Sequence, residues 1–326
     1  MPKEFRYDRF RKSRHLPDLH RTASDGPLYA VGPLVARRTT ESADDRPYEL
    51  FSLTPKTPTI GAEVSGIRLT GDLSDDVLAE LRRALLEWKV LFFRDQDIDR
   101  ADHRAFAARW GELEQHPFFK YTQPGQSDAD VATLAKDAMA AGVENMWHND
   151  VTWHEFPSFA AVLRGVEVPD VGGDTLWADT GAAYDLLPED LRARIDHLEA
   201  EHDWINSFGR GMPAETVEML RPVFPPVVHP VVRVIPETGR RVLFVNSVFT
   251  QRIVGVSEEE SNEILRALYR HVQRPEFQVR LHWSPDTIAF WDNRTCQHYA
   301  SSDYFPSRRV MDRISIVGDK PVGVTA

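Results

Sequence analysis

The chain has 326 residues, and its 42% hydrophobic and 27% charged residues are typical of a globular protein with a substantial core. The formal net charge of −11 argues against a general nucleic-acid binder, because phosphate neutralisation requires a basic face. The single cysteine, Cys296, excludes an intrachain disulfide. The first residues are charged throughout and no apolar run reaches about 18 residues, so we expect a cytoplasmic protein without a membrane segment.

Residues 1–48 mix basic and acidic side chains with Pro, Ser and Thr, and they show no sustained helix or strand period. Acidic residues interrupt the arginines of this stretch, which favours a solvated extension over a polyanion-binding arm. The sequence therefore predicts a partly irregular N-terminal extension over 1–48 and a single domain over 49–326.

The first half of this domain shows alternating strand and helix signals. A loose alternation around two glycines predicts a strand within 57–69. A helix is predicted over 74–89, with Ser74 as N-cap, acidic residues in the first turn and leucines on one face. A buried strand over 90–96 and a short helix over 100–111 follow.

Strands dominate after residue 145. Residues 229–246 predict a hairpin that turns at 236–239, and a helix is expected over 257–273 after the N-cap Ser257. Further strands are expected over 277–283, 287–291 and 308–318. Many short strands, few helices and no regular βαβ alternation along the chain predict a mainly β fold, a sandwich or jelly roll with helices packed outside.

The segment 147–158, WHNDVTWHEFPS, contains three possible metal ligands, His148, Asp150 and His154. On a strand, side chains at 148 and 150 share one face, with Cα atoms about 6.6 Å apart, a spacing that suits two ligands of one ion. Together with a distant histidine, they would form the facial triad of non-haem Fe(II) oxygenases, which leaves coordination positions open. Because the chain has 12 histidines, a chance pair without a metal remains an alternative.

The C-terminal part adds a histidine and two arginines. His298 lies in a strand-like context, and Arg309 and Arg313 would share one face of the strand predicted after it. Two inward guanidiniums are costly to bury without anionic partners. They indicate a cavity for an anion, and the alternative is salt bridges within the chain, for which the candidate carboxylates are Asp292, Asp303 and Asp312.

Four segments resemble the signature blocks of the taurine dioxygenase (TauD/TfdA) family of Fe(II)- and 2-oxoglutarate-dependent oxygenases. They are WHNDVTW (147–153), GGDTLWADT (172–180), WDNRTCQHYASSDY (291–304) and RRVMDRISIVGDKP (308–321). The blocks occur in the order of that family and close to its spacing, and the similarity covers about residues 57–321. It implies a double-stranded β-helix (jelly-roll) core.

By this resemblance, the iron ligands and catalytic centre are His148, Asp150 and His298, and the cofactors are Fe(II), 2-oxoglutarate and O2. Thr175 and Arg309 would hold the distal carboxylate of 2-oxoglutarate, a role that suits a bidentate guanidinium and an added hydroxyl. Without its block, Thr175 would be taken for an ordinary strand residue. A phosphate-loop interpretation of the glycines before it lacks the Gly-Lys-Ser/Thr that should follow.

The resemblance also suggests residues that contact the substrate. His116 and Arg313 match the positions that bind the sulfonate of taurine in the taurine-type members, where they would form an anion clamp. Phe208 and Phe249 match the aromatic residues that line the aliphatic part of the substrate, although lone aromatics more often belong to a core.

Two positions depart from the taurine-type pattern. Phe119 replaces a tyrosine, and Glu144 replaces an asparagine near the amine, where it could pair with an ammonium or face solvent. The segment 120–145, rich in small and polar residues, lies where the family has a mobile lid.

The expected activity is hydroxylation of a small anionic substrate, taurine or a related alkylsulfonate first, with release of sulfite, an aldehyde, CO2 and succinate. Alternatives are the same oxidation of an alkyl sulfate or an aryloxyacetate-like carboxylate, a catalytically inactive jelly-roll binding module, and a hydrolytic zinc site. We expect no nucleic-acid or membrane partner, and the family suggests a homodimer or homotetramer. His154 is then surplus to the metal site.

Overall fold

The computed structural model of the chain describes residues 46–118, 121, 130–139, 142 and 144–325, together with the backbone of 22–23 and 26–27. Strands β1 (Thr22–Ala23) and β2 (Gly26–Pro27) pair with each other. Almost all of the predicted extension, Phe119 and part of the predicted lid over 120–145 lie outside the described residues. The division into an extension and one domain therefore stays a prediction.

The main sheet has eight strands and is mixed. Its order is β3 (Ser52–Pro55), β4 (Ala62–Ser65), β5 (Val90–Phe93), β16 (Ile288–Asp292), β8 (Ala160–Glu167), β18 (Arg309–Ile316) and β6 (Leu113–Glu114), and β7 (Ala132–Lys136) also pairs with β18. Of these pairings, β4 with β5 is parallel and the others are antiparallel. The strands predicted over 90–96, 287–291 and 308–318 are confirmed.

The strand predicted over 57–69 is confirmed only for β4. Residues 57–61 bend instead, and Gly61 at their end adopts φ +83°, a left-handed conformation that other residues rarely enter. A Cβ at this position would lie 2.8 Å from a methyl carbon of Val279. The glycine therefore marks a turn packed closely against a neighbouring strand.

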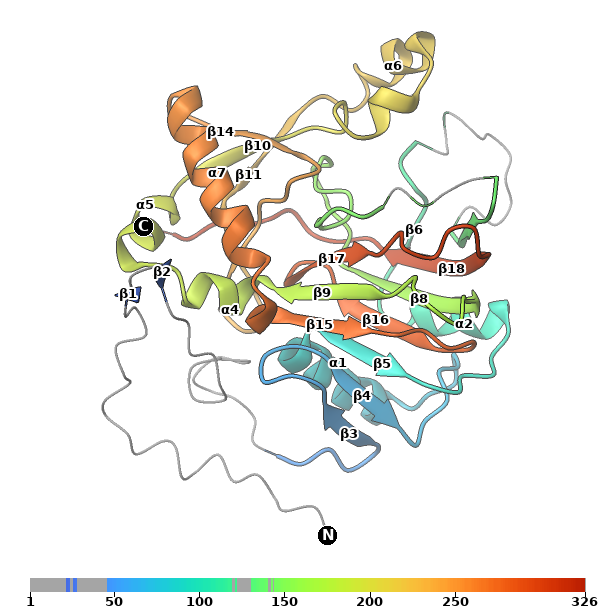
Figure 1. The fold of residues 1–326 in the computed structure, drawn as a ribbon. Coiled ribbons are helices and arrows are strands. Elements are labelled where there is room, and N and C mark those ends of the chain that lie inside the picture. Colours follow the sequence, from blue (N-terminus) through green and yellow to red (C-terminus); the bar gives the residue numbers. More distant parts are fainter. Residues whose placement is uncertain are drawn as a thin grey trace.

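A second sheet faces the main one, with the order β15 (Gln278–Leu281), β9 (Thr175–Asp179) and β17 (Cys296–Ala300) (Figure 1). Buried side chains of both sheets form one core cluster, in which the ring of Trp177 lies 5.4 Å from Phe92 and 5.7 Å from Trp291. Two facing sheets with helices outside confirm the predicted mainly β jelly-roll class. The metal-ligand candidate His298 lies on β17, and the two candidate arginines lie on β18.

Helices α1 (Asp75–Trp88) and α2 (Arg100–Ala108) cover the outer face of the main sheet. Leu81, Leu85 and Trp88 of α1 share a buried cluster with Phe290 of β16, and Phe106 of α2 packs edge-on against the same ring at 5.7 Å. Ser74 caps α1 by accepting from the amide of Val77, as predicted. Both predicted helices are confirmed, and their apolar faces fix them on the sheet.

The remaining elements pack beside and above the second sheet. They are α4 (Thr180–Asp185), α5 (Glu189–Ile195), β10 (Glu199–His202), η2 (Phe208–Gly211), α6 (Ala214–Leu220), β11 (Val227–Pro230), β12 (Val232–Val234), β13 (Arg241–Leu243), β14 (Thr250–Ile253), α7 (Glu258–Val272) and η3 (Pro275–Phe277). The pairing of β12 with β13 and the Ser257 cap of α7 confirm the predicted hairpin and helix. The short helices and the sheet of β11, β10 and β14 were not predicted.

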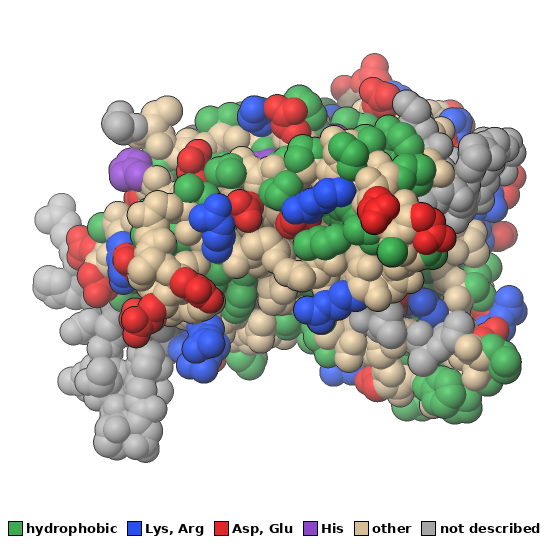
Figure 2. All heavy atoms as spheres, turned by 90° about the horizontal axis from the view of Figure 1, so that it is seen from above, with side chains coloured by type: hydrophobic (Ala, Val, Ile, Leu, Met, Phe, Trp, Pro, Cys, Tyr) green, Lys and Arg blue, Asp and Glu red, His purple; other side chains and the backbone are tan. Residues whose placement is uncertain are grey.

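Two surface observations bear on possible partners. Basic side chains are interspersed with acidic ones on the face drawn in Figure 2. Among the helices that the structure describes, none has both the length and the apolar composition to cross a membrane.

Candidate metal centre and active site

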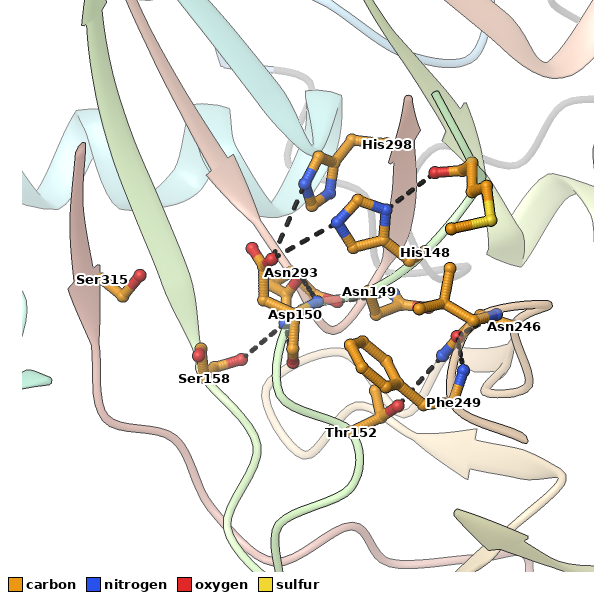
Figure 3. A network of polar contacts seen from close by, with 12 residues as sticks. His148, Asn149, Asp150, Thr152, Ser158, Asn246, Phe249, Asn293, His298 and Ser315 are labelled. Atoms are coloured by element: carbon orange, nitrogen blue, oxygen red, sulfur yellow. Dashed lines mark hydrogen bonds and ion pairs between the residues drawn. The ribbon is translucent and has the colours of Figure 1, made fainter. Parts of the chain in front are cut away.

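Three side chains from two distant segments converge at one end of the second sheet. The ligand atoms of His148, Asp150 and His298 all lie within 4.8 Å of one another. Nε2 of His148 is 3.6 Å and Nε2 of His298 is 3.7 Å from the same carboxylate oxygen of Asp150 (Figure 3). Two imidazole nitrogens and one carboxylate oxygen are a donor set that suits Fe(II). They would bind the ion from one side and leave its other coordination positions open.

The segment 147–152 does not form the strand on which the spacing argument was based, although the two candidate ligands do converge. His148 forms an isolated antiparallel bridge with His298, and a turn begins at Asp150, where Val151 adopts φ +56°. The amide of His148 donates to the carbonyl of His298 at 3.0 Å, and the reverse bond is 2.8 Å. The ligands are therefore brought together by this bridge and the turn after it, and not by strand alternation.

The protonation states of the triad suit a divalent cation. Burial opposes ionisation of Asp150, but Arg313 and the two histidines outweigh it and lower its pKa to about 2. Burial lowers the pKa of His298 to about 3, against the opposing charge of Asp150. Nδ1 of His148 donates a hydrogen bond to the carbonyl oxygen of Met146 at 2.8 Å. The lone pair of Nε2 is then available for a metal. A carboxylate and neutral imidazoles are the forms that bind metals.

Arg309 is a buried cation at the other end of the candidate site, with only 7% of its surface exposed. Its Nε donates to the carbonyl of Gly173 at 3.2 Å, and Nη2 lies 3.5 Å from Oγ1 of Thr175. Trp283 donates to the same hydroxyl at 3.0 Å. Burial lowers the pKa of Arg309, against the opposing effects of Tyr304 and of the carboxylates of Glu144 and Asp174, which lie more than 4.0 Å from its guanidinium.

Among the described residues, neither Arg309 nor Arg313 pairs with the three carboxylates that the salt-bridge alternative named, and Arg313 instead forms an ion pair with Asp150. Asp292 pairs with Arg294, Asp303 with Arg280, and Asp312 with Arg100. Arg309 thus has no ion-pair partner within 4.0 Å among the described residues, and a bidentate carboxylate would match its planar fork. Gly173, whose φ is +70°, lets the chain pass close to this guanidinium, because a Cβ there would lie 3.2 Å from its Cδ.

A pocket that is open to solvent, with about 620 Å³ of empty space including that opening, connects His148 and His298 with Arg309. Its walls include His148, His298, Thr175, Arg309 and Arg313, and also Lys136, Glu144 and Tyr304. The carboxylate of Glu144 pairs with Nζ of Lys136 at 3.1 Å. Lys136 lies in the predicted lid, where no sequence signal marked it, and Tyr304 belongs to the third signature block, which could have drawn attention to it.

The four other candidate substrate residues lie near the triad. Nη2 of Arg313 is 2.7 Å from the second carboxylate oxygen of Asp150. Burial, and then the nearby charge of Arg313, lower the pKa of His116 to about 4, so this imidazole is neutral at pH 7. An aromatic wall runs from His116 through Phe208 and Phe249 to His148. The ring centroids along it are 5.7, 5.8 and 6.4 Å apart, in that order.

His154 does not join the metal cluster. Its carbonyl oxygen lies 3.0 Å from Nε2 of His229, and its ring packs between Phe156 and Phe224 at 6.4 and 6.1 Å. It is a packing residue beyond the ligand turn, as predicted.

The sequence profile described as "Taurine catabolism dioxygenase TauD, TfdA family" matches residues 51–315. The chain belongs to the TauD/TfdA family. An alpha-ketoglutarate-dependent sulfate ester dioxygenase of Pseudomonas putida is 39% identical over 274 residues, which are 81% of this chain and 89% of that protein. An alkylsulfatase of Acinetobacter baylyi is 37% identical over 287 residues, 85% of this chain and 88% of that protein.

The structural comparison agrees with the sequence comparison. The crystal structure of a taurine dioxygenase from Burkholderia xenovorans matches with a TM-score of 0.71 at 38% identity and covers 84% of this chain and 93% of that one. This TauD/TfdA member is thus a 2-oxoglutarate-dependent non-haem iron dioxygenase with a jelly-roll core, and it uses Fe(II), 2-oxoglutarate and O2 to oxidise a small molecule. The inactive binding module and the zinc hydrolase are set aside.

Proposed function

We propose that the chain oxidises an alkyl sulfate ester or a related alkylsulfonate, with the sulfate ester first. The observation that carries the proposal is the cavity that joins an open His-Asp-His triad to a buried arginine without a described acidic partner. One end suits a metal with free coordination positions and the other a dicarboxylate.

His148, Asp150 and His298 would hold Fe(II), and Arg309 with Thr175 would hold the distal carboxylate of 2-oxoglutarate. The iron and the cosubstrate supply the oxidising power when bound. The protein contributes the fixed distance between the two ends of the cavity and a largely buried environment for Asp150 and His298.

Arg313 and His116 would bind the anionic group of the substrate. The guanidinium can give up its ion pair with Asp150 to a metal and turn to a tetrahedral oxyanion, while a neutral His116 can donate one hydrogen bond. Phe208 and Phe249 would contact the alkyl chain. Because both rings belong to one aromatic wall, this side of the site favours an apolar substrate body.

The position of Glu144 disfavours taurine within this set. Among the described residues that line the cavity, Glu144 is the acidic one. Its carboxylate is paired with Lys136, on the side of Thr175 and Arg309. An ammonium group would need a free acidic partner near the substrate end. A sulfate ester has no ammonium, and two relatives of this chain carry names that refer to sulfate esters or alkyl sulfates.

Both substrate classes would react at the carbon that carries the sulfur group. Hydroxylation of R–CH2–OSO3⁻ gives a hemiacetal sulfate, whose C–O bond breaks as the hydroxyl loses its proton, which yields an aldehyde and hydrogen sulfate. Hydroxylation of R–CH2–SO3⁻ gives a 1-hydroxysulfonate, whose C–S bond breaks as the hydroxyl loses its proton, which yields an aldehyde and hydrogen sulfite. In each case 2-oxoglutarate becomes succinate and CO2, so the sulfur product distinguishes the substrates.

The test compares pentyl sulfate, pentanesulfonate, taurine and phenoxyacetate with Fe(II)-loaded protein, O2 and 2-oxoglutarate. We expect succinate and sulfate in equal amounts from pentyl sulfate, and slower sulfite release from pentanesulfonate. Sulfite from taurine at a higher kcat/KM would overturn the sulfate preference. If no anion raises succinate formation above the substrate-free rate, the organosulfur proposal fails. The homo-oligomeric state and the cytoplasmic location remain predictions from the sequence.

A further inference from the structure

Two buried asparagines lie between the metal-ligand segments, and neither was singled out in the sequence. Asn149 stands between His148 and Asp150 and is fully buried. Its Nδ2 donates to the carbonyls of Asn293 at 2.7 Å and of Cys296 at 2.9 Å, in the turn that leads into β17 (Figure 3). The residue between the two ligands thus ties them to the strand that carries the third.

Asn293, in the turn between β16 and β17, forms hydrogen bonds back to the segment that contains Asp150. Its Oδ1 accepts from the amide of Asp150 at 2.8 Å, and its Nδ2 donates to the carbonyl of Asp150 at 3.1 Å and to that of Ser158 at 3.0 Å. One side chain therefore satisfies both backbone groups of a metal ligand, as a neighbouring strand would. Asp150 lies in a turn, where no strand performs this task.

We propose that Asn149 and Asn293 are positioning residues that hold the three ligands at metal-binding separation before a metal arrives. Together with the backbone bridge between His148 and His298, they connect residues 148–150 to the β16–β17 turn at three places. The inference rests on the proposed metal site, but it does not depend on the identity of the substrate.

An amide is required at both positions because its NH2 group faces carbonyl oxygens. A carboxylate of the same shape cannot donate to them, and its charge would be repelled by these oxygens and by the nearby ligand Asp150. Substitution of either asparagine by aspartate should push residues 148–150 away from the turn. The variants Asn149→Asp and Asn293→Asp test this with almost no change in volume.

Asn246 offers a matched control. It is also fully buried, its Oδ1 accepts from the amides of Val248 and Phe249, and its Nδ2 donates to the hydroxyl of Thr152 at 3.0 Å. A hydroxyl, unlike a carbonyl, can rotate and donate to a new carboxylate. Asn246→Asp therefore introduces the same buried charge, but the new carboxylate oxygen can accept from the hydroxyl of Thr152. The hydrogen bonds between residues 148–150 and the β16–β17 turn are not altered by this substitution.

The experiment measures Mn(II) affinity by competition with a chelator, and the visible absorption spectrum of the Co(II)-loaded protein, with no substrate present. Loss of a hydrogen-bond partner behind metal ligands typically weakens affinity by about 10- to 100-fold, and we expect this for Asn149→Asp and Asn293→Asp. Their Co(II) spectra should also change, whereas Asn246→Asp should keep wild-type affinity and spectrum. A purely structural role would lower the unfolding temperature of the metal-free protein and leave the spectrum unchanged.

Asn149→Ala covers the case in which the charged variants do not fold, because it removes two donor bonds and adds no charge. We expect weaker Mn(II) binding from this variant as well. Wild-type affinity and an unchanged Co(II) spectrum in the folded variants would overturn the inference while the proposed function stands. If the wild-type protein binds neither metal ion, the proposed metal site itself fails.

Discussion

Replacement of Arg309 by methionine should separate cosubstrate binding from stability. The side chain is 7% exposed, and its hydrogen-bond partners among the described residues include the carbonyl of Gly173 and the hydroxyl of Thr175. The described carboxylates that act on its charge, Glu144 and Asp174, lie beyond 4.0 Å, so without 2-oxoglutarate the protein carries a buried charge with no close acidic partner among the described residues. Methionine has a similar length and fills the space with an apolar chain.

The substitution should preserve or raise the stability of the cosubstrate-free protein, but it should weaken the binding of 2-oxoglutarate. Removal of the hydrogen bonds costs about 0.5–1.5 kcal/mol each, whereas desolvation of one buried ion costs several kcal/mol, so the cosubstrate-free variant should be as stable as the wild type or more stable. Loss of one partner of a buried charge pair weakens binding by about 2–5 kcal/mol, roughly 30- to 4,000-fold in the dissociation constant of 2-oxoglutarate.

Thermal unfolding of the Mn(II)-loaded protein, with and without 2-oxoglutarate, measures both effects. At 100 times its dissociation constant, the cosubstrate should stabilise the wild type by about 2.7 kcal/mol and leave Arg309→Met nearly unchanged. Arg308→Met is the matched control, since the neighbouring Arg308 is exposed and pairs with Glu167 at the surface. A variant that is clearly less stable without 2-oxoglutarate, yet keeps the cosubstrate-dependent shift, would refute the reasoning.

Three further predictions concern individual charged and titratable side chains. Arg313→Gln should raise the KM of the sulfur substrate far more than that of 2-oxoglutarate in steady-state kinetics, and the opposite pattern would exchange the roles of the two arginines. Burial lowers the pKa values of His103 and His229 to about 4, so the unfolded chain binds more protons than the folded one below pH 6.5. Urea unfolding of the metal-free protein should therefore show stability falling from pH 6.5 to pH 4, by up to about 1.4 kcal/mol per pH unit for each histidine, and a flat profile would contradict this. Lys89→Met should destabilise the protein by about 3–5 kcal/mol, because it removes the buried partner 3.1 Å from Asp179, and an unchanged urea midpoint would mean that other contacts satisfy this carboxylate.

Local signals in the sequence were sufficient for the elements with strong periodicity. Ser74 and Ser257 each open a helix with one apolar face, and the runs that became β5, β16 and β18 are apolar enough to predict buried strands. The signature blocks pointed to His148, Asp150 and His298 as proposed ligands and to Arg309 as the proposed carboxylate-binding residue, because a fixed chemistry requires fixed residue types in a fixed order. The short helices and the β11–β10–β14 sheet escaped prediction, since their few residues carry little periodicity and depend on packing.

The tertiary structure decided how these residues meet. The sequence suggested that strand alternation places His148 and Asp150 together, but a turn and a single backbone bridge to β17 do so. Asn149 and Asn293 hold that turn through side-chain hydrogen bonds to partners about 140 residues away, and no local pattern reports such bonds. Composition and motifs therefore determined the class of chemistry, whereas the closeness of the two proposed ligand segments, the pairing of Glu144 with Lys136 and the burial of Arg309 arise only when distant parts of the chain pack against one another.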